Sequence, residues 1–573
     1  MMSLSPIALA LVLAPQQPPA NSLEIVPLLA RRPLAVNMLP PFGTLLPRPT
    51  ELAQLRRDLL RVAGDDGDVS VDELPQRLLE SVHQPDSEAG RLNWSLDSQQ
   101  LFLTGQHDLV ARTRDELIAL GAVVQRPIEV TAELYAGTDI ADPPVLIAGG
   151  DARDAGRGEL LWSAVASAPQ GRALAFDAMR WSRYVYGANV EVAQKSMLSN
   201  AVLGVFGEGL SATVLPCGLA GSEDVVLYVQ FACGQRRRID SVSTGVPGQA
   251  SIDVPLLETT FATAAARVPA GGTLQIVVGG HADAGARLVL ALRPRYPTPR
   301  PTPPQANFLA IPILALTTRA MRERYVPTEP TPQVGDGWPD LQSTFDGDTL
   351  INEDRLADVV RQAIGDEQIE VSTQSNHLLV IGPEPAQRTA LATIGQLQDR
   401  LLQTTVVRVS TELEEVNGTA PFAVPVANAH RAVLHRIALP TLAGRTAFAF
   451  RGVESNAIRT MMPEIAQEAA LTTPLVEVRQ SGLWLRCDIP DAGGNDLPEL
   501  FVQSDQTAPA QLRNLGGAGA LHLADVDSLR ISRRSEWPAD RELVLGTGTT
   551  VQLDGRSWRP TVRAVRSRPG LKD

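Results

Sequence analysis

The chain has 573 residues and a formal net charge of −13, a length that suits several domains of about 100 to 200 residues each. The acidic balance argues against a nucleic-acid-binding surface, because such a surface needs clustered Lys and Arg to displace counterions. With 4% aromatic residues, 45 glycines and 44 prolines, the composition favours many turns and an all-β or α+β fold over long helices.

The N-terminal segment predicts export. Residues 1–21 contain a short apolar run, Ile7–Ala14, followed by several prolines and Ala20. This arrangement indicates a signal peptide cut near Ala20, although no Lys or Arg precedes the apolar run. No later segment reaches the roughly 20 consecutive apolar residues of a membrane-spanning helix. Residues 22–70 are expected to form a separate N-terminal segment.

Residues 71–135 predict a first small α/β module. Apolar and polar residues alternate on both sides of a polar corner within Leu92–Gly105, as in a half-buried hairpin. Apolar residues at helical spacing follow from Val110 to Leu120, and Gly121 is expected to end this helix. Alternation over Ile128–Tyr135 then predicts a strand with one face exposed to water.

The same elements return in the same order within residues 346–416. Leu378–Gly382 corresponds to Leu101–Gly105, a helical stripe from Ala390 to Leu401 follows, and Val407–Leu413 corresponds to Ile128–Leu134. A helical pattern precedes each copy. The chain therefore contains an internal duplication.

Each module leads into a stretch that predicts many short strands. Residues 136–296 form the first β-rich domain and residues 417–573 the second, with a loose tail expected from Arg563 to Asp573. In the first domain, alternate residues of Val225–Phe231 are apolar on one face and mixed on the other. The core of a β-sandwich explains this pattern, and a face turned toward lipid or a neighbouring subunit is the alternative.

A Pro-rich connection separates the two copies. It covers residues 293–345 and begins with the sequence RPRYPTPRPTPP at Arg293–Pro304. Such a run favours an extended polyproline spacer. The chain is therefore expected to divide into two halves here.

The three cysteines leave two interpretations open. Cys217 and Cys233 flank two adjacent predicted strands, so an exported protein could join them by a disulfide, or both could be buried free thiols. Cys487 is left over. No Cys and His spacing suits a metal, and no nucleophile elbow, P-loop, zinc-protease or kinase motif occurs in the sequence. We therefore expect no catalytic residue, no cofactor and no metal.

Several of these motifs resemble one family. The repeated order of helix, strand, the glycine-ended strands Leu101–Gly105 and Leu378–Gly382, helix and strand resembles the ring-building periplasmic module of secretins, the gate subunits of type II and type III secretion systems and type IV pili. Gly209–Pro216, Gly271–Gly280 and Arg287–Pro294 resemble strands of the domain that builds the secretin barrel. Secretins carry a longer, membrane-associated segment where this chain has only residues 281–286.

The resemblance implies an α+β fold in which tandem KH-like modules are each followed by a β-rich domain. It implies a non-enzymatic structural subunit of a secretion or pilus-type assembly, located in the periplasm or outer membrane of a Gram-negative-type envelope. Its expected partners are further copies of the chain and other secretion or envelope proteins. Nucleic acid is not expected, because neither module has the G-x-x-G loop that grips RNA in KH domains. The positions expected to serve assembly are Leu101, Leu103, Gly105, Leu378, Val380, Gly382, Gly279 and Gly280. The alternative is a periplasmic binding or scaffolding protein that kept these modules without forming a channel.

Overall fold

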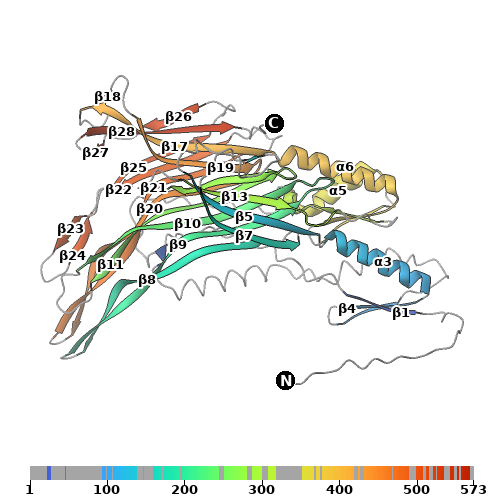
Figure 1. Cartoon of the computed structure of the whole chain (residues 1–573), viewed down its shortest axis with the longest axis horizontal. Coiled ribbons are helices and arrows are strands. Elements are labelled where there is room, and N and C mark those ends of the chain that lie inside the picture. The colour runs from blue at the N-terminus through green and yellow to red at the C-terminus, as the bar shows by residue number, and fades with distance from the viewer. Residues whose placement is uncertain are drawn as a thin grey trace.

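A computed structural model gives the fold (Figure 1). It describes residues 22–27, 45–46, 93–97, 100–105, 107–124, 126–137, 146–147, 159–169, 173–193, 196–243, 251–280, 287–299, 308–317, 351–366, 369–374, 377–418, 424–425, 431–466, 469–489, 498–507, 511–514, 520–523, 526–534, 542–547, 551–553 and 556–567. The predicted signal peptide, the helical pattern before the first module and most of the Pro-rich connection lie outside these residues.

The two predicted modules have the same construction. In the first, β4 (Gln100–Gly105) lies between β1 (Ser22–Pro27) and β3 (Asn93–Asp97), and in the second β16 (His377–Ile381) lies between β14 (Phe308–Pro312) and β15 (Glu370–Gln374). The helices α3 (His107–Val124) and α6 (Glu384–Leu401) follow, each 18 residues long. The predicted hairpins and helices are therefore confirmed, and each module sheet has an additional outer strand, β1 or β14.

The predicted end of the first module's helix was wrong. Helix α3 continues through Gly121 to Val124, because a glycine inside a helix is tolerated where packing supports the helix. The strands after the helices, β5 (Pro127–Gly137) and β17 (Thr404–Asn417), do not join the module sheets. They continue instead into the β-rich region.

The second module contains two further helices. The N-cap of helix α5 (Glu353–Ile364) is Asn352, whose side chain accepts a hydrogen bond from the backbone N–H of Asp354. Its C-cap is Gly365, which has a left-handed backbone conformation. This is the usual pairing of an Asn cap with a terminal glycine. A single turn, α4 (Leu314–Thr317), follows β14.

The β-rich region consists of two halves, defined here as Pro127–Arg295 and Thr404–Ser567. The strands of the first half are β5, β6 (Leu146–Ile147), β7 (Glu159–Pro169), β8 (Leu174–Ala193), β9 (Ser196–Gly218), β10 (Val225–Val242), β11 (Ile252–Val268), β12 (Thr273–Gly280) and β13 (Arg287–Arg295). The strands of the second half are β17, β18 (Val424–Pro425), β19 (Arg431–Leu442), β20 (Thr446–Ala466), β21 (Ala469–Asp488), β22 (Glu499–Thr507), β23 (Gln511–Asn514), β24 (Ala520–Leu523), β25 (Val526–Arg534), β26 (Glu542–Thr547), β27 (Val551–Leu553) and β28 (Arg556–Ser567).

The halves share one plan of strand pairing. In each half the first strand pairs with the next long strand and with the last strand: β5 with β7 and β13, and β17 with β19 and β28. Between them runs a meander, β8-β9-β10-β11 in the first half and β20-β21-β22-β25 in the second. The long hairpins β8–β9 and β20–β21 carry a bulge at the same distance from their turns, at Val185/Gly187 and at Ile458/Thr460. The two halves therefore share the same order of strand pairing and the same bulge position.

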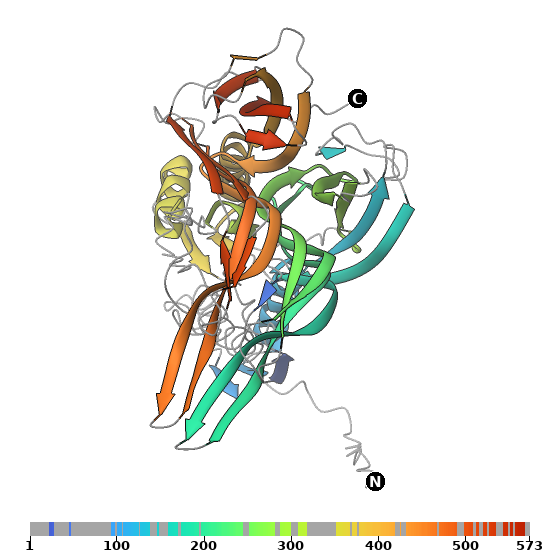
Figure 2. The ribbon, with the colours of Figure 1, turned by 90° about the vertical axis from the view of Figure 1, so that its left-hand side faces the viewer.

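The two meanders form one continuous sheet, because β11 pairs with β20. The β-rich stretches that the sequence places on either side of a Pro-rich spacer are thus joined edge to edge. Figure 2 shows the long hairpins β8–β9 and β20–β21 projecting together beyond the rest of the sheet. The short strand β2 (Leu45–Leu46) adds to β9.

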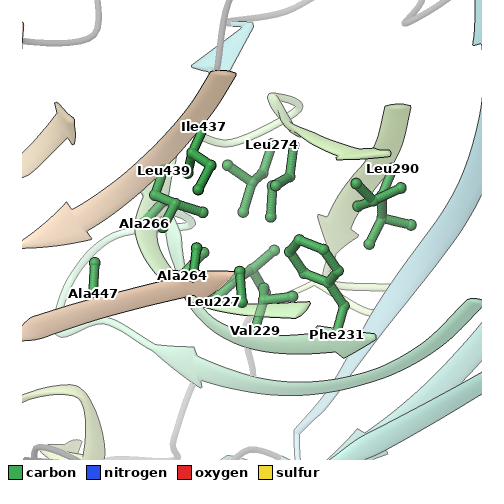
Figure 3. Close-up of a cluster of buried hydrophobic side chains, with 14 of the residues drawn as sticks. Leu227, Val229, Phe231, Ala264, Ala266, Leu274, Leu290, Ile437, Leu439 and Ala447 are labelled. Carbon is green, nitrogen blue, oxygen red and sulfur yellow. The ribbon is translucent and has the colours of Figure 1, made fainter. Parts of the chain in front are cut away.

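One core lies between this sheet and two smaller sheets, one from each half. Its residues include Leu227, Phe231 and Ala264 from the long sheet, and Leu290 and Ile437 from the smaller sheets (Figure 3). Strands from both halves therefore contribute side chains to the same apolar interior, which makes their association favourable by burying apolar surface.

The opposite face of β10 is also buried. Val226 and Tyr228 pack in a second cluster with the second module, including Ile313, Leu356 and Ile394. The mixed face of this strand is thus covered by an α/β module of the same chain, and the alternative that it faces lipid or another subunit was wrong. The interpretation as a packed sandwich is confirmed here.

The C-terminal segment is ordered further than expected. The predicted loose tail begins at Arg563, but β28 continues to Ser567 and pairs with β17 from Val406 to Glu415. The strand is held because its alternate residues Val562 and Ala564 are buried in the core.

Glycine at position 209 is required by the approach of two strands. Gly209 has φ +119°, and a Cβ there would lie 1.9 Å from the carbonyl oxygen of Ala178. We expect Gly209→Ala to lower the free energy of unfolding by about 2 kcal/mol or more. In the control Gly395→Ala on α6, an added Cβ meets nothing within 4 Å, and replacing a helical glycine should add about 0.5–1 kcal/mol. Urea unfolding of both variants tests this, and equal midpoints would contradict it.

Candidate assembly interface

The pairing of β11 with β20 is the place where two equivalent units meet. The antiparallel register runs from Leu256 opposite Ser455 to Thr263 opposite Phe448. We call this pairing the internal junction. Its partners lie on opposite sides of the Pro-rich connection, so the junction is a contact between halves rather than a local hairpin.

An aromatic cluster covers one face of the internal junction. Phe261 of the first half stands directly opposite Phe450 of the second, with ring centroids 5.1 Å apart. Trp484 lies 4.4 Å from Phe450 and 5.5 Å from Phe261, and Phe448 completes the cluster. Cross-strand aromatic pairs of this kind stabilise a sheet beyond the apolar area they bury.

The internal junction also satisfies a buried carboxylate. Glu454 is 1% exposed, and its oxygens accept hydrogen bonds from the Thr259 hydroxyl at 3.1 Å and from the Gln480 side-chain amide at 2.7 Å. Thr259 comes from the first half and Gln480 from the second. A buried polar group of this kind is costly unless it is hydrogen-bonded, so these contacts specify the register of the two halves.

The second module is fixed to the sheet of the first half by polar contacts. The Gln398 side chain on α6 accepts a hydrogen bond from the backbone N–H of Ala220 at 2.8 Å, and the Tyr228 hydroxyl donates to the carbonyl of Ala315 at 3.0 Å. Arg267 on β11 forms ion pairs with Asp224 and with Asp399 of α6 at 2.9 and 2.7 Å. Burial lowers the pKa of Arg267, but the two carboxylates outweigh it and leave the pKa raised. The second module thus packs its helices against the sheet of the first half.

The predicted assembly positions lie mainly inside their own modules. Leu103, Leu378 and Val380 are 0% exposed on the central strands of the module sheets, and Leu101 occupies the corresponding position on β4. Gly105 is the last residue of β4 and Gly382 directly follows β16, and a Cβ on Gly382 would lie 3.2 Å from the side chain of Ile369. Gly279 and Gly280 lie at the end of β12, after a bulge in its pairing with β13. Their part in assembly stays a prediction.

The cysteines do not form a disulfide. Cys217, Cys233 and Cys487 are all free and buried. Cys217 lies opposite Val226 and Cys233 opposite Leu210, so the first two are separated along the hairpin and face different clusters. The two sulfurs are therefore too far apart to bond. Burial raises the pKa of the Cys233 thiol to about 12, which keeps it protonated and unreactive.

Sequence reasoning missed the residues of the internal junction. Residues 447–451 form a recognisable strand, but nothing in the sequence pairs them with Phe261. Within the part of the chain that the structure describes, no group of three or more His, Cys, Asp or Glu is placed to hold a metal ion. Among the same residues, none of the helices combines the length and the apolar character needed to cross a membrane.

His435 couples the stability of β19 to pH. Burial lowers its pKa from 6.5 to about 4, and the positive charges of Arg451 and Arg237 act in the same direction. Between about pH 6.5 and 4 the unfolded chain therefore binds a proton that the folded chain does not, so stability is lost as the pH falls through this window.

We expect His435→Gln to flatten this part of the pH profile, because the substitution removes the titrating group. Guanidinium unfolding midpoints at pH 7, 5.5 and 4.5 measure the slope, and His107→Gln on the exposed start of α3 is the matched control. Parallel profiles for His435→Gln and the unmodified chain would contradict the assignment.

The comparison with known proteins rests on solved structures of low sequence identity. No family model matches the chain, and no curated protein matches it. Among solved structures, the secretin-domain β-barrel of InvG from the Salmonella SPI-1 injectisome is 14% identical, with 50% of this chain and 90% of that chain covered and a TM-score of 0.23.

Two other secretins are similarly distant. GspD of ETEC, in complex with the pilotin AspS, is 9% identical over 87% of this chain and 86% of that one, with a TM-score of 0.22. PilQ, the type IV competence pilus secretin of V. cholerae, is 14% identical over 38% of this chain and 75% of that one, with a TM-score of 0.18. The function is therefore inferred from the strand pairing within the chain and from its sequence motifs.

Proposed function

We propose that the chain is a non-enzymatic, secretin-like structural subunit of a cell-envelope secretion or pilus-type assembly, exported to the periplasm or outer membrane. The observation that carries this proposal is the internal junction: two equivalent units join edge to edge through β11 and β20. Units that join in this head-to-tail manner repeat until a ring closes or a filament grows. The sequence resemblance to the secretin modules and core strands agrees with a ring.

The packing of the second module supports a role for the modules in assembly. Its helices cover β9 and β10 of the other half through an apolar cluster and the contacts of Gln398 and Asp399. The equivalent contact between chains would place the first module of one copy on the second half of its neighbour. Other envelope proteins are then expected to bind the assembled wall.

The mass of the purified protein lacking residues 1–20 tests this function. Light scattering in buffer and in mild detergent is expected to give a mass many times that of one chain. A monomer in both solutions would overturn the proposal. It would favour the second candidate, a periplasmic binding or scaffolding protein.

That second candidate is favoured by one observation. Strand β12 ends at Gly280 and β13 begins at Arg287, so the connection between them is too short to hold the longer membrane-associated segment of secretins. Detergent separates the two candidates, because a channel-forming ring should be stabilised by it and a scaffolding protein should not respond.

A further inference from the structure

The continuous sheet has a strand at each end that lacks an outer neighbour. Among the described residues, β8 pairs only with β9 and β25 only with β22. These strands are the first of one meander and the last of the other. Their equivalents, β20 and β11, pair with each other inside the chain.

We propose that β25 of one chain pairs with β8 of the next chain, antiparallel and in the register of the internal junction, so that each chain supplies two equivalent sectors of a ring. This inference rests on the proposed function and adds to it the interface strands, their register and the sector count. The occupant of both open edges is a second copy of this chain.

The register between chains follows from a row of directly paired residues that crosses the whole sheet. The row is Ala178, Leu210, Cys233, Thr260, Arg451, Leu483, Ser504 and Leu529. The first four positions of the row are structurally equivalent to the last four, because Ala178 and Arg451 lie at the same distance from the bulges of their hairpins. The residue that follows Leu529 in the row is therefore Ala178 of the next copy.

This register brings opposite charges together. Arg530 stands opposite Asp177 of the next copy, at the place that Phe261 and Phe450 occupy inside the chain. Asp527 similarly stands opposite Arg180. Asp177 and Arg180 are both exposed, although Asp177 accepts a hydrogen bond from Ser211 of the adjacent strand. Directly opposed charges of opposite sign favour strand pairing. Sliding β25 by three residues would instead place Arg530 opposite Arg180, a pair of like charges.

The second layer has an equivalent open surface. Inside the chain, β19 lies beside β11, and Ala438 and Leu439 are buried there. The equivalent strand of the first half, β7, exposes Leu161 and Val165 by 50% and 59%. On β8, Trp181 is 42% exposed. A second copy in the proposed position would cover this apolar surface, as the first half covers β19.

Part of β8 is already occupied by its own chain. The Tyr186 hydroxyl donates a hydrogen bond to the carbonyl of Val476 on β21, and the backbone N–H of Val185 donates to Asp253. The stretch that corresponds to the internal junction ends before these residues, at Ser182. The edge offered to the next copy is therefore residues 175–182.

A cysteine pair tests the register directly. Ala178→Cys with Leu529→Cys is expected to give a ladder of two, three and more chains joined by disulfides under oxidising, non-reducing conditions. In the control Ala178→Cys with Ser532→Cys, the sites are displaced by roughly 10 Å along the strand, too far to bond. The native cysteines are buried, and the unmodified chain serves as the blank.

The outcomes separate the inference from the proposed function. If the Ala178→Cys, Leu529→Cys variant assembles to the same mass as the unmodified chain but forms no disulfide between chains, the inference is overturned and the proposed function stands. A monomer by light scattering overturns the function. Equal cross-linking of both cysteine pairs also overturns the proposed register.

Charge reversal gives a second test that does not depend on cysteine. Asp177→Arg and Arg530→Asp are each expected to weaken assembly about fivefold, and the combined variant is expected to restore it. Failure of the combined variant to recover would overturn the pairing. In end-on images, the assembly is expected to show twice as many sectors as it has chains by mass, and an equal number would overturn the two-sector count.

Discussion

Replacing Phe450 with alanine is expected to lower the free energy of unfolding by about 3–5 kcal/mol, the usual cost of deleting a large buried aromatic side chain. Phe450 is 0% exposed, and it contacts Phe261 across the internal junction and Trp484 on β21. The cavity would lie between the two halves, beside the backbone pairing of β11 with β20. The loss should therefore loosen the junction in particular.

Hydrogen exchange distinguishes loosening of the junction from a general loss of stability. In Phe450→Ala the backbone amides of β11 and β20 should exchange faster than those of β12 and β13. The matched control is Phe231→Ala, which removes an equally buried aromatic from the shared core rather than from the aromatic cluster of the junction. If both variants accelerate exchange evenly across all strands, the aromatic cluster has no special role in joining the halves.

The sequence predicts the hairpins and helices of the two modules well, because each arises from the spacing of apolar residues within one short segment. The alternation in Leu101–Gly105 and Leu378–Gly382 and the stripes that follow give both module hairpins and both long helices. The end of α3 was placed too early because a glycine alone does not end a helix. The strand after each helix is also predicted, but not the sheet that it joins, since pairing partners are chosen by packing over long distances.

The internal junction lies beyond such patterns for a physical reason. Phe261 and Phe450 are separated by the whole Pro-rich connection and the second module, and no periodicity links them. A composition rich in proline between two β-rich stretches predicts separation, whereas the burial of a shared core, including Ala266 and Leu439 (Figure 3), favours union. The cysteines show the same limit, because adjacent strands place Cys217 and Cys233 on one hairpin without placing them opposite each other.

The two halves keep the same plan of strand pairing although their side chains differ. Gly209 and Gly482 hold the same place beside the hairpin partner strand, and in both a Cβ would collide with a backbone carbonyl, of Ala178 and of Arg451. The side chains at the two kinds of edge differ: aromatic residues at the internal junction, charged residues at the outer edges. Buried apolar pairs suit a permanent contact, and charged pairs suit an edge that must stay soluble before assembly.

Replacing Arg563 with methionine is expected to lower the free energy of unfolding by about 3–5 kcal/mol, because it leaves carboxylates buried without their cation. The guanidinium of Arg563 contacts Glu412, Glu414 and Glu542 at 3.1, 3.0 and 3.1 Å. Burial lowers the pKa of Arg563, but the hydrogen bond to Glu414 and the charges of the other two carboxylates leave it raised. The side chains of Glu414 and Glu412 are 9% and 14% exposed, so water replaces the lost cation only in part.

Two further variants isolate the charge effect of Arg563. Arg388→Met removes an exposed arginine that lies 3.8 Å from Glu384 on α6, and such a surface pair should contribute less than about 0.5 kcal/mol. Adding Glu414→Gln to Arg563→Met should recover part of the loss, since the amide carries no charge to be left unpaired. Urea unfolding at neutral pH measures these three variants, Glu414→Gln alone and the unmodified chain. A loss below about 1 kcal/mol for Arg563→Met, or a double variant less stable than the sum of its single changes, would show that Arg559, at 3.3 Å from Glu414, already compensates the buried charge.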